Sequence, residues 1–297
     1  MRWCGLPGHQ FFAPLPNMTD PDQYAVVGNP VAHSRSPEIH AAFARQVGHQ
    51  IIYSRMLAPL DQFVATLDAF RVAGGCGVNV TVPFKREAYH YATEHTPRAA
   101  EAAAANTLRF EIASAEPRII ADNTDGVGLV RDIGINLGRT ISKKRILLLG
   151  AGGAAHGVMG ALRGEKPHSI TIHNRTTDKA HELAGQFSSM TGGVAIDVVE
   201  SRELAARQFD IVINATAAGL TNSLPLVPET VFADDCLAYD MVYGKATPFL
   251  ALAAKAGATT ADGLGMLVEQ AAEAFYFWRG VRPQTGPVIA ALRLPQS

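Results

Sequence analysis

The sequence has little cysteine, little net charge and no long apolar segment. Its 297 residues include three cysteines, Cys4, Cys76 and Cys236, which lie far apart and form no CxxC pair. This spacing argues against a zinc site or a disulfide framework and favours free thiols in a reducing compartment. The formal net charge of −1 exerts no overall attraction on nucleic acid or on an acidic membrane, so any anion must be bound by a local group of donors.

Membrane-spanning and targeting signals are also missing from the sequence. No apolar run approaches the roughly 18 residues that a membrane-spanning helix needs, and the N-terminus has no basic segment followed by an apolar one. The ten histidines show no spacing typical of metal ligands. We therefore expect a cytoplasmic protein that binds small molecules, with no metal, nucleic acid or membrane partner, as either a monomer or a homodimer.

Apolar residues, in contrast, are plentiful. They make up 47% of the chain, against 18% charged residues. A chain of this length can bury large cores, and domains of about 150 residues are typical, so we expect two domains. Residues 1–22 are rich in proline and lack periodicity, and Met18 precedes the first predicted strand by only a few residues. This segment is expected to be a flexible tail, or the start of the chain is assigned too early.

From residue 24 onward, apolar strands alternate with amphipathic helices. Such alternation predicts a parallel or mixed α/β sheet. Pro83 suits the first turn of a helix that contains Lys85, and residues 106–110 and 118–121 have the pattern of two short strands in a hairpin. The first predicted strands and helices cover residues 24–28, 36–47, 51–57, 60–73 and 77–82.

The second half begins with a continuous apolar strand at residues 146–149, of the kind that is buried on both faces. The strands that follow, separated by helices, predict a doubly wound sheet. A last apolar helix at residues 266–278 can pack back on the first domain and make that domain discontinuous. The other strands of this half are predicted at residues 169–173, 194–198, 210–214 and 236–240, with one more near Ala258.

A glycine-rich segment, Gly150-x-Gly152-x-x-Ala155, follows the apolar strand and opens the next helix. Glycines with this spacing allow a tight turn and bring a pyrophosphate close to a helix N-terminus. The alternative is a purely structural turn, but the position between a strand and a helix favours nucleotide binding. We expect the cofactor loop to comprise Gly150, Ala151, Gly152, Gly153 and Ala154.

The end of the second strand of this half indicates which dinucleotide is bound. An NAD site usually places an acid there to bond the ribose hydroxyls, whereas this chain has Asn174-Arg175-Thr176. A charge-assisted bond from Arg175 to a 2′-phosphate is worth about 1.5–3 kcal/mol, and Lys179 can add positive charge. The alternative is that Arg175 is a solvated residue at a helix start. We predict NADP as the cofactor.

Lys85 and Asp125 are candidates for proton transfer. Each belongs to a polar block that follows a predicted strand, at residues 79–85 and 122–126. Lys85 can instead be a surface lysine, and Asp125 can be an N-cap. However, open α/β sheets form their clefts at strand ends. Polar residues recur at such ends here: Asn79, Thr81, Asn106, Thr107, Asn123 and Thr124.

Ser34 and Ser36 place two hydroxyls at the start of a predicted helix, in which Pro37 can take the first position. Hydroxyls at a helix start can serve as a plain N-cap, or they can hold a substrate carboxylate. The residues alone leave both interpretations open.

Taken together, these blocks resemble the shikimate dehydrogenases, NADP-dependent enzymes of aromatic amino-acid biosynthesis. The resemblance extends from Tyr24 to the last helix. So many blocks in one order exclude coincidence. They lie at residues 28–37, 79–85, 106–107, 122–126, 150–154, 174–176, 214–216, 239–243 and 261–270.

The resemblance implies an α/β fold of two domains with a cleft between them. Residues 23–122 and 264–297 would form an N-terminal α/β domain that binds the substrate and carries the catalysis. Residues 123–263 would form a Rossmann-like, doubly wound domain that binds NADP. The implied reaction is the reversible reduction of 3-dehydroshikimate to shikimate, a step of the shikimate pathway to chorismate.

The resemblance also implies roles for individual residues. Lys85 and Asp125 would be the catalytic pair, and Ser34 and Ser36 would hold the substrate carboxylate. The other substrate contacts would come from Asn79, Thr81, Asn106, Tyr243 and Gln270. The cofactor would be held by the glycine-rich loop and, around the 2′-phosphate and nicotinamide, by Asn174, Arg175, Thr176, Lys179, Met241 and Gly263.

Two departures from the family pattern and three rival functions accompany this interpretation. Ala217-Ala218 replaces the serines of many relatives, and Lys179 stands where an arginine is frequent. Lysine keeps the charge but lacks the planar fork, so NADP preference would depend more on Arg175.

The rivals are a quinate or dual-specificity dehydrogenase, a non-catalytic metabolite sensor, and a reductase of a tethered substrate, which would not need the paired serines.

Overall fold

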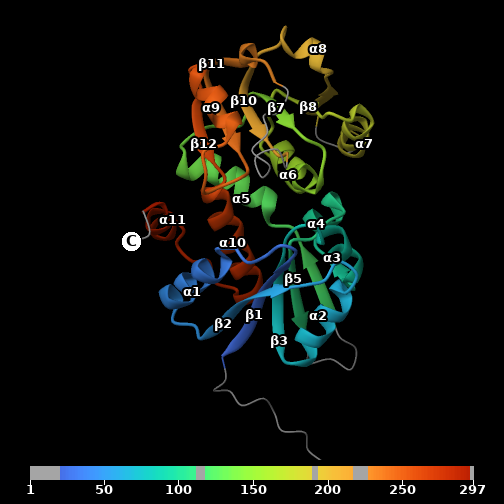
Figure 1. The fold of residues 1–297 in the computed structure, drawn as a ribbon, viewed down its shortest axis with the longest axis vertical. Helices are drawn as coiled ribbons and strands as arrows, with labels where there is room; N and C mark the ends of the chain where they lie inside the picture. The colour runs from blue at the N-terminus through green and yellow to red at the C-terminus, as the bar shows by residue number, and fades with distance from the viewer. Residues whose placement is uncertain (1–20, 112–117, 189–192, 217–226, 295–297) are drawn as a thin grey trace, which may run out of the picture.

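A computed structural model of the chain describes residues 21–111, 118–188, 193–216 and 227–294. Most of the predicted tail, Cys4 and Ala217-Ala218 lie outside the described residues. Figure 1 shows two α/β halves stacked along the long axis of the molecule, with helices α5 and α10 where the halves meet. The predicted α/β fold of two domains is confirmed.

The first half is built on a six-stranded mixed sheet in the order β2-β1-β3-β5-β6-β4. Strands β1, β2 and β3 run parallel, β5 is antiparallel to both β3 and β6, and β4 is parallel to β6. The predicted antiparallel pair is therefore confirmed. The strands are β1 (Asp22–Gly28), β2 (Ile51–Leu57), β3 (Gly75–Val80), β4 (Glu94–His95), β5 (Thr107–Glu111) and β6 (Arg118–Asp122).

Apolar side chains on both faces hold the helices of this half to its sheet. Phe63 and Phe84 stack with ring centroids 4.7 Å apart in a core that lies under α2 and α3. Helix α3 begins at Lys85, with Phe84 as its N-cap, so the predicted place of Pro83 in its first turn is wrong. Pro83 lies in the turn before the helix. The helices are α1 (Ser36–Val47), α2 (Phe63–Val72), α3 (Lys85–Tyr91) and α4 (Pro97–Ala102).

The second half is built on a six-stranded parallel sheet in the order β12-β11-β10-β7-β8-β9. The strand order reverses between β7 and β10, which is where a doubly wound sheet forms its ligand crevice. The predicted doubly wound sheet is confirmed. Its strands are β7 (Arg145–Leu149), β8 (Ser169–His173), β9 (Ala195–Val198), β10 (Phe209–Asn214), β11 (Phe232–Asp240) and β12 (Thr259–Asp262).

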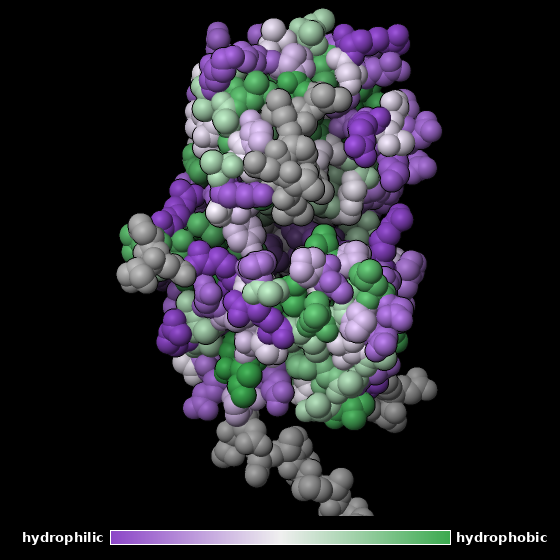
Figure 2. All heavy atoms as spheres, in the orientation of Figure 1, coloured by the Kyte–Doolittle hydropathy of each residue, from purple (hydrophilic) through white to green (hydrophobic). Residues whose placement is uncertain are grey.

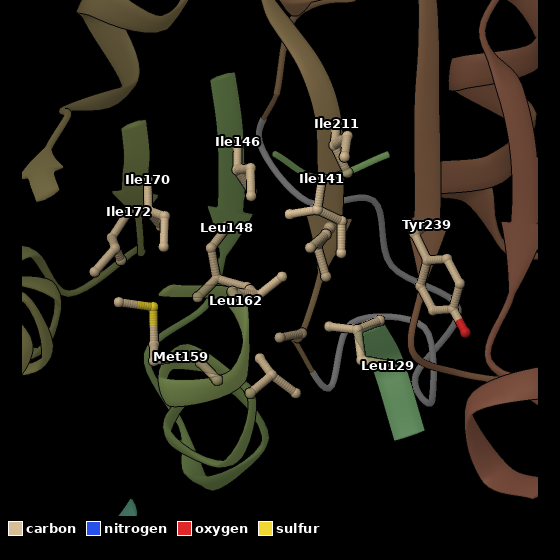
Figure 3. Close-up of a cluster of buried hydrophobic side chains, with 14 of the residues drawn as sticks. Leu129, Ile141, Ile146, Leu148, Met159, Leu162, Ile170, Ile172, Ile211 and Tyr239 are labelled. Carbon is tan, nitrogen blue, oxygen red and sulfur yellow. The ribbon is translucent and has the colours of Figure 1, made fainter. Parts of the chain in front are cut away.

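Strand β7 lies at the centre of this sheet and is buried on both faces, as its apolar run predicted. Ile146 and Leu148 belong to one core cluster, and Leu147 and Leu149 to another on the opposite face. Figure 3 shows Leu148 beside Leu162 of helix α6, with Ile146 further along the strand. The helical segments of this half are α6 (Gly153–Gly164), α7 (Thr177–Ser188), α8 (Ser201–Leu204), the 3-10 turn Glu229–Val231 and α9 (Pro248–Lys255).

Helices α5 (Asp125–Arg131) and α10 (Leu264–Arg279) lie between the halves and contact each other extensively. A π-helical segment, Asp132–Asn136, continues α5, and a last helix, α11 (Gly286–Arg293), follows α10. Helix α10 also packs on α1, since Phe275 shares a core cluster with Ile39 and Phe43. The last long helix therefore returns to the first sheet.

Glycines let α5 approach its neighbours closely. A Cβ atom on Gly126 would lie 2.7 Å from the Cβ of Ala161 on α6, and one on Gly128 would lie 2.7 Å from the Cβ of Gln270 on α10. Real Cβ atoms do not come so close, so larger side chains at these two positions would push the helices apart.

Two further sequence expectations concern thiols and membranes. Cys76 and Cys236 are free thiols, as predicted. Within the described part of the chain, each helix is too short or too polar to cross a bilayer.

We expect Gly128→Ala to destabilise the protein. Alanine normally favours a helix over glycine by about 1 kcal/mol, but here overpacking against α10 costs about 1–3 kcal/mol. Gly134→Ala, where a Cβ would meet no atom within 4 Å, is the matched control and should be neutral or stabilising. Urea unfolding midpoints measure the difference, and equal behaviour of the two variants would contradict the close helix crossing.

Candidate active site

Lys85 and Asp125 meet where the two halves adjoin. Lys85 begins α3 after strand β3, and Asp125 begins α5 after strand β6. The Lys85 amine donates a hydrogen bond to Asp125 Oδ2. Their side chains are 19% and 8% exposed, so the pair is largely shielded from water. The N-cap of α5 is Thr124, so the N-cap interpretation of Asp125 is wrong.

Asn106, directly before β5, fixes the carboxylate of this pair. Its Nδ2 lies 2.8 Å from Asp125 Oδ1, 2.9 Å from Thr124 Oγ1 and 3.1 Å from Gln270 Oε1, and its two hydrogens are shared among these three acceptors. Its Oδ1 accepts from the backbone N–H of Thr124 at 2.8 Å and from Thr107 Oγ1 at 3.0 Å. One amide thus holds both a catalytic candidate and Gln270, which comes from the far end of the chain.

A chain of hydrogen bonds continues from Asn106 toward the paired serines. Asn79 Nδ2 donates to Thr107 Oγ1 at 3.0 Å, and its Oδ1 accepts from the Tyr53 hydroxyl at 2.7 Å. Burial raises the pKa of Tyr53 well above its usual value, and a hydrogen bond from Ser36 opposes that rise. Ser34 Oγ donates to Ser36 Oγ at 3.1 Å. Polar contacts therefore connect the serines to the Lys85 and Asp125 pair.

Tyr53 is not among the site residues that were predicted from the sequence. It lies on β2, an edge strand of the sheet, and no motif or turn marks it. The only signal is its aromatic hydroxyl in a predicted strand. Thr107 and Thr124, in contrast, stand out as polar residues at strand ends, although no role was assigned to them.

Ser34 and Ser36 do not cap helix α1 in the ordinary way. The N-cap is Arg35, which makes no side-chain capping bond, and Ser36 is the first helical residue with Pro37 behind it. The plain N-cap interpretation is therefore wrong for Ser36. Both hydroxyls, with Ser36 itself buried, remain grouped at the helix start.

The second half contributes Tyr243, Met241 and Gly263 to the same region. Burial raises the pKa of the Tyr243 phenol, and the backbone amide of Arg35 opposes this rise, so Tyr243 reaches across to the start of α1. A Cβ on Gly263 would lie 2.3 Å from the Met241 carbonyl oxygen, so these two residues are in direct contact. Figure 2 shows a recess between the halves on the face in view.

Thr81 occupies the turn that follows β3. Its backbone N–H donates to the Val27 carbonyl at 2.9 Å, which anchors the turn to β1. Its γ-methyl group fills the space beside Gly28, where an added Cβ would come within 2.3 Å. The turn that carries Thr81 is therefore packed tightly against the first strand, four residues before Lys85.

The glycine-rich loop has the geometry of a phosphate cradle. Gly150 has a φ of +107° and donates its N–H to the His173 carbonyl at 2.8 Å. Gly152 caps helix α6, which begins at Gly153. A Cβ on Gly152 or Gly153 would meet no atom within 4 Å, so the loop and the helix N-terminus face open space. These features fit the pyrophosphate of a dinucleotide.

The residues after β8 fit a phosphate on the ribose of such a dinucleotide. Asn174 Nδ2 donates to the Thr176 carbonyl at 2.8 Å and closes the turn. Arg175 and Thr176 are exposed, and Lys179 is exposed on the first turn of α7. Within the described residues, neither cation forms an ion pair that would occupy it. Both charges are therefore available to an anion.

His40 lies beneath the substrate side of the site. It is fully buried on α1 and stacks on the Tyr53 ring with centroids 4.3 Å apart. Neither ring nitrogen has a hydrogen-bond partner in the described structure. Burial lowers the pKa of His40 to about 3, and Asn79 opposes this shift only in part. The imidazole is therefore neutral at physiological pH.

Three family models match successive parts of the chain. The shikimate dehydrogenase substrate binding domain matches residues 26–108. The model described as shikimate / quinate 5-dehydrogenase matches residues 134–223. The shikimate 5′-dehydrogenase C-terminal domain matches residues 263–293. Together they span both halves and the returning helix.

Individual relatives agree with these models. Shikimate dehydrogenase (NADP(+)) of Aromatoleum aromaticum is 56% identical over 274 residues, which cover 92% of this chain and 97% of that protein. The enzyme of the same name from Methylobacillus flagellatus is 56% identical over 273 residues, with 92% and 99% covered.

Solved structures give the same result. The Ael1 enzyme of Pseudomonas putida has a TM-score of 0.85 at 45% identity, covering 93% of this chain and all of that one. The shikimate 5-dehydrogenase of Thermus thermophilus, solved with NADP(H) and shikimate, has a TM-score of 0.80 at 32% identity, with 92% and 98% covered.

We expect His40→Phe to reduce the acid sensitivity of the fold. The folded-state pKa of His40, about 3, lies below the ordinary value of about 6.5 in the unfolded chain. The stability due to neutral His40 is therefore present above pH 6.5 and is lost as the pH falls toward 3. At pH 5 the loss is about 2 kcal/mol. Urea unfolding of both proteins at pH 8 and pH 5 measures it, and parallel pH dependences would contradict the assignment.

Proposed function

This chain belongs to the shikimate dehydrogenase family, and we propose that Lys85 and Asp125 are the catalytic pair with which it reversibly reduces 3-dehydroshikimate to shikimate. The enzyme is an NADP-dependent oxidoreductase of the shikimate pathway. The observation that carries the catalytic assignment is the shielded Lys85–Asp125 contact, which Asn106 holds in place at the junction of the two halves.

Reduction of a ring ketone needs a proton on the oxygen as well as a hydride on the carbon. The bound NADPH supplies the hydride. Lys85 donates the proton to the developing alkoxide in reduction, and in oxidation a neutral Lys85 accepts it. Asp125 accepts a hydrogen bond from the Lys85 amine and orients it.

The remaining substrate contacts follow from the groups around this pair. Ser34 and Ser36 offer two hydroxyls at a helix N-terminus, which suits the substrate carboxylate. Amide and hydroxyl groups suit the ring hydroxyls, because each can donate and accept a hydrogen bond. We assign this second role to Asn79, Thr81, Asn106, Tyr243 and Gln270.

The second half supplies the groups that hold NADP. Residues 150–154 would hold the pyrophosphate at the N-terminus of α6: Gly150, whose N–H is bonded to the His173 carbonyl, shapes the turn, and Gly152 and Gly153 leave open space beside the backbone. Asn174, Arg175, Thr176 and Lys179 would surround the 2′-phosphate. Met241 and Gly263, in contact with each other, would line the nicotinamide side.

We further propose the division of the chain into its two domains. Residues 23–122 with 264–297 form the substrate-binding domain, and residues 123–263 the NADP-binding domain. The separate sheets and the packing of α10 on α1 support this division. Strand β1 begins at Asp22, one residue before the proposed boundary.

The partners of the enzyme are its substrate and NADP, and we propose that it works in the cytoplasm as a monomer or a homodimer. Two free thiols, Cys76 and Cys236, suit a reducing compartment. Substrate and cofactor groups come from different halves, so binding is expected to involve closure of one half on the other.

Initial rates of nicotinamide reduction test the function directly. Purified protein is assayed with shikimate or quinate, each paired with NADP⁺ or NAD⁺. Turnover confined to shikimate with NADP⁺ is the expected result. Activity on quinate would support a dual-specificity enzyme, and tight shikimate binding without turnover would support a metabolite sensor.

Lys85→Ala should lower the rate constant of turnover by roughly 10²–10⁴, because loss of a general acid typically costs that much. NADP binding, which this side chain does not touch in the proposal, should be nearly unchanged. Lys255→Ala is the control, because it removes an exposed lysine at the end of α9, which pairs with Glu229. A fall of less than tenfold for Lys85→Ala would refute its role as the acid.

Arg175→Asp should weaken NADP⁺ about ten- to hundredfold more than NAD⁺. The variant loses a charge-assisted bond to the 2′-phosphate and adds a repelling charge. Arg202→Asp makes the same charge change at an exposed position on α8 and should affect both cofactors little. The affinities for NADP⁺ and NAD⁺ are measured by fluorescence quenching or calorimetry. If Arg175→Asp weakened the binding of both cofactors equally, Arg175 would not be the residue that recognises the 2′-phosphate.

A further inference from the structure

Two arginines and one glutamate surround the backbone of the paired serines. Arg55, on β2, donates its Nε–H to the Ser34 carbonyl at 2.8 Å. Arg35 lies between the two serines in sequence, and its Nε is 3.1 Å from Glu38 Oε2. Glu38 Oε1 lies 3.7 Å from the Arg55 guanidinium. One glutamate thus serves two arginines, so the group keeps one excess positive charge.

The two arginines differ in how far partners neutralise their charge. Arg35 has the shorter contact with Glu38 and also donates to the Leu292 carbonyl at 3.2 Å. Arg55 has only the longer contact with Glu38, and its side chain is 37% exposed, against 24% for Arg35. Arg55 is therefore the cation of this group whose charge is less compensated by a partner.

Tyr243 places this group at the junction of the halves. Burial raises the pKa of the Tyr243 phenol, the Arg35 backbone and the charges of Arg35 and Arg55 oppose that rise, and the charge of Glu38 adds to it. The phenol comes from the second half and lies near both arginines and Glu38, so this charged group borders the junction of the halves.

On the basis of the proposed function, we infer that Arg55 is a further recognition residue for the substrate: its hydrogen bond to the Ser34 carbonyl keeps the guanidinium beside the serines, and its charge supplies the positive potential that draws the substrate carboxylate to Ser34 and Ser36. The protein as a whole carries a formal charge of −1, so this potential is local. Local potentials in a cleft raise the association rate of oppositely charged ligands.

The inference predicts a salt-dependent and charge-selective effect. Exposed charges act over about 10 Å at 0.1 M salt and only about 3 Å at 1 M. An effect of Arg55 through its field must therefore weaken as salt is added. It must also spare a substrate that has the same ring but no charge. The methyl ester of shikimate meets that condition.

The experiment compares kcat/KM for shikimate and for methyl shikimate, with NADP⁺, at salt concentrations from 0.01 to 1 M. The proteins are the wild type, Arg55→Gln and Arg55→Lys. Arg118→Gln is the control, because it removes the same charge at a distant site where Arg118 pairs with Glu94 and Glu111. The melting temperature of each variant shows whether it folds.

For Arg55→Gln we expect kcat/KM with shikimate to fall about tenfold at low salt, mainly through KM, with the loss shrinking below about threefold at 1 M. The ester should be nearly unaffected, and Arg55→Lys should recover most of the loss because lysine keeps the charge. Arg118→Gln should match the wild type.

An equal loss for shikimate and the ester, a loss that salt does not change, or no loss at all would overturn the role of Arg55. A lysine variant as weak as the glutamine variant would do the same. The wild type serves to separate the two proposals. If it fails to oxidise shikimate with NADP⁺, the proposed function falls as well, whereas a normal wild type confines the failure to Arg55.

Discussion

The geometry of the site depends on the close crossing of three helices. Helix α5 begins with Asp125, and its glycines let it lie directly against α6 and α10. Gly157 on α6 belongs to the same contact, because a Cβ there would come within 3.0 Å of Asp125 Oδ2. The space that the Asp125 carboxylate occupies therefore depends on glycines of α5 and α6 at the points where these helices meet their neighbours.

The directions of the hydrogen bonds around Asn79 and Asn106 are a second constraint on the site, because they fix the orientation of both side-chain amides. Asn106 and Asn79 each donate through Nδ2 and accept through Oδ1, and their neighbours match this arrangement. An amide turned over would place two donors or two acceptors against each other, and a buried mismatch of that kind costs about 1–3 kcal/mol. The amides thus have one favourable orientation before any ligand arrives, which reduces the ordering that binding requires.

Sequence pattern predicted most of the fold because its signals are local. The apolar run of β7, the glycines after it and the returning helix α10 all follow from periodicity and turn chemistry. The start of α3 was misplaced because proline suits both the first turn of a helix and the turn before it. N-cap interpretations failed for Ser36 and Asp125 because capping depends on backbone angles that residue type does not determine.

Tyr53 was missed for a different reason. Its partner Asn79 lies 26 residues away, and the two strands that carry them are separated by β1. Their contact is a product of strand order and register, which no short motif encodes. The catalytic candidates, in contrast, stand in polar blocks at strand ends, where the topology of an open sheet brings them together.

The path of the chain also has a consequence for its synthesis on the ribosome. The first sheet is complete once β6 has been made, yet Ile39 and Phe43 of α1 are covered by Phe275, which emerges more than 140 residues after β6 begins at Arg118. Domains generally fold as units during synthesis. The second half, whose strands are continuous in sequence, can therefore fold while the first still exposes an apolar helix face. The half made first is thus the half completed last, and it is the one that most needs protection from aggregation while the polypeptide is growing.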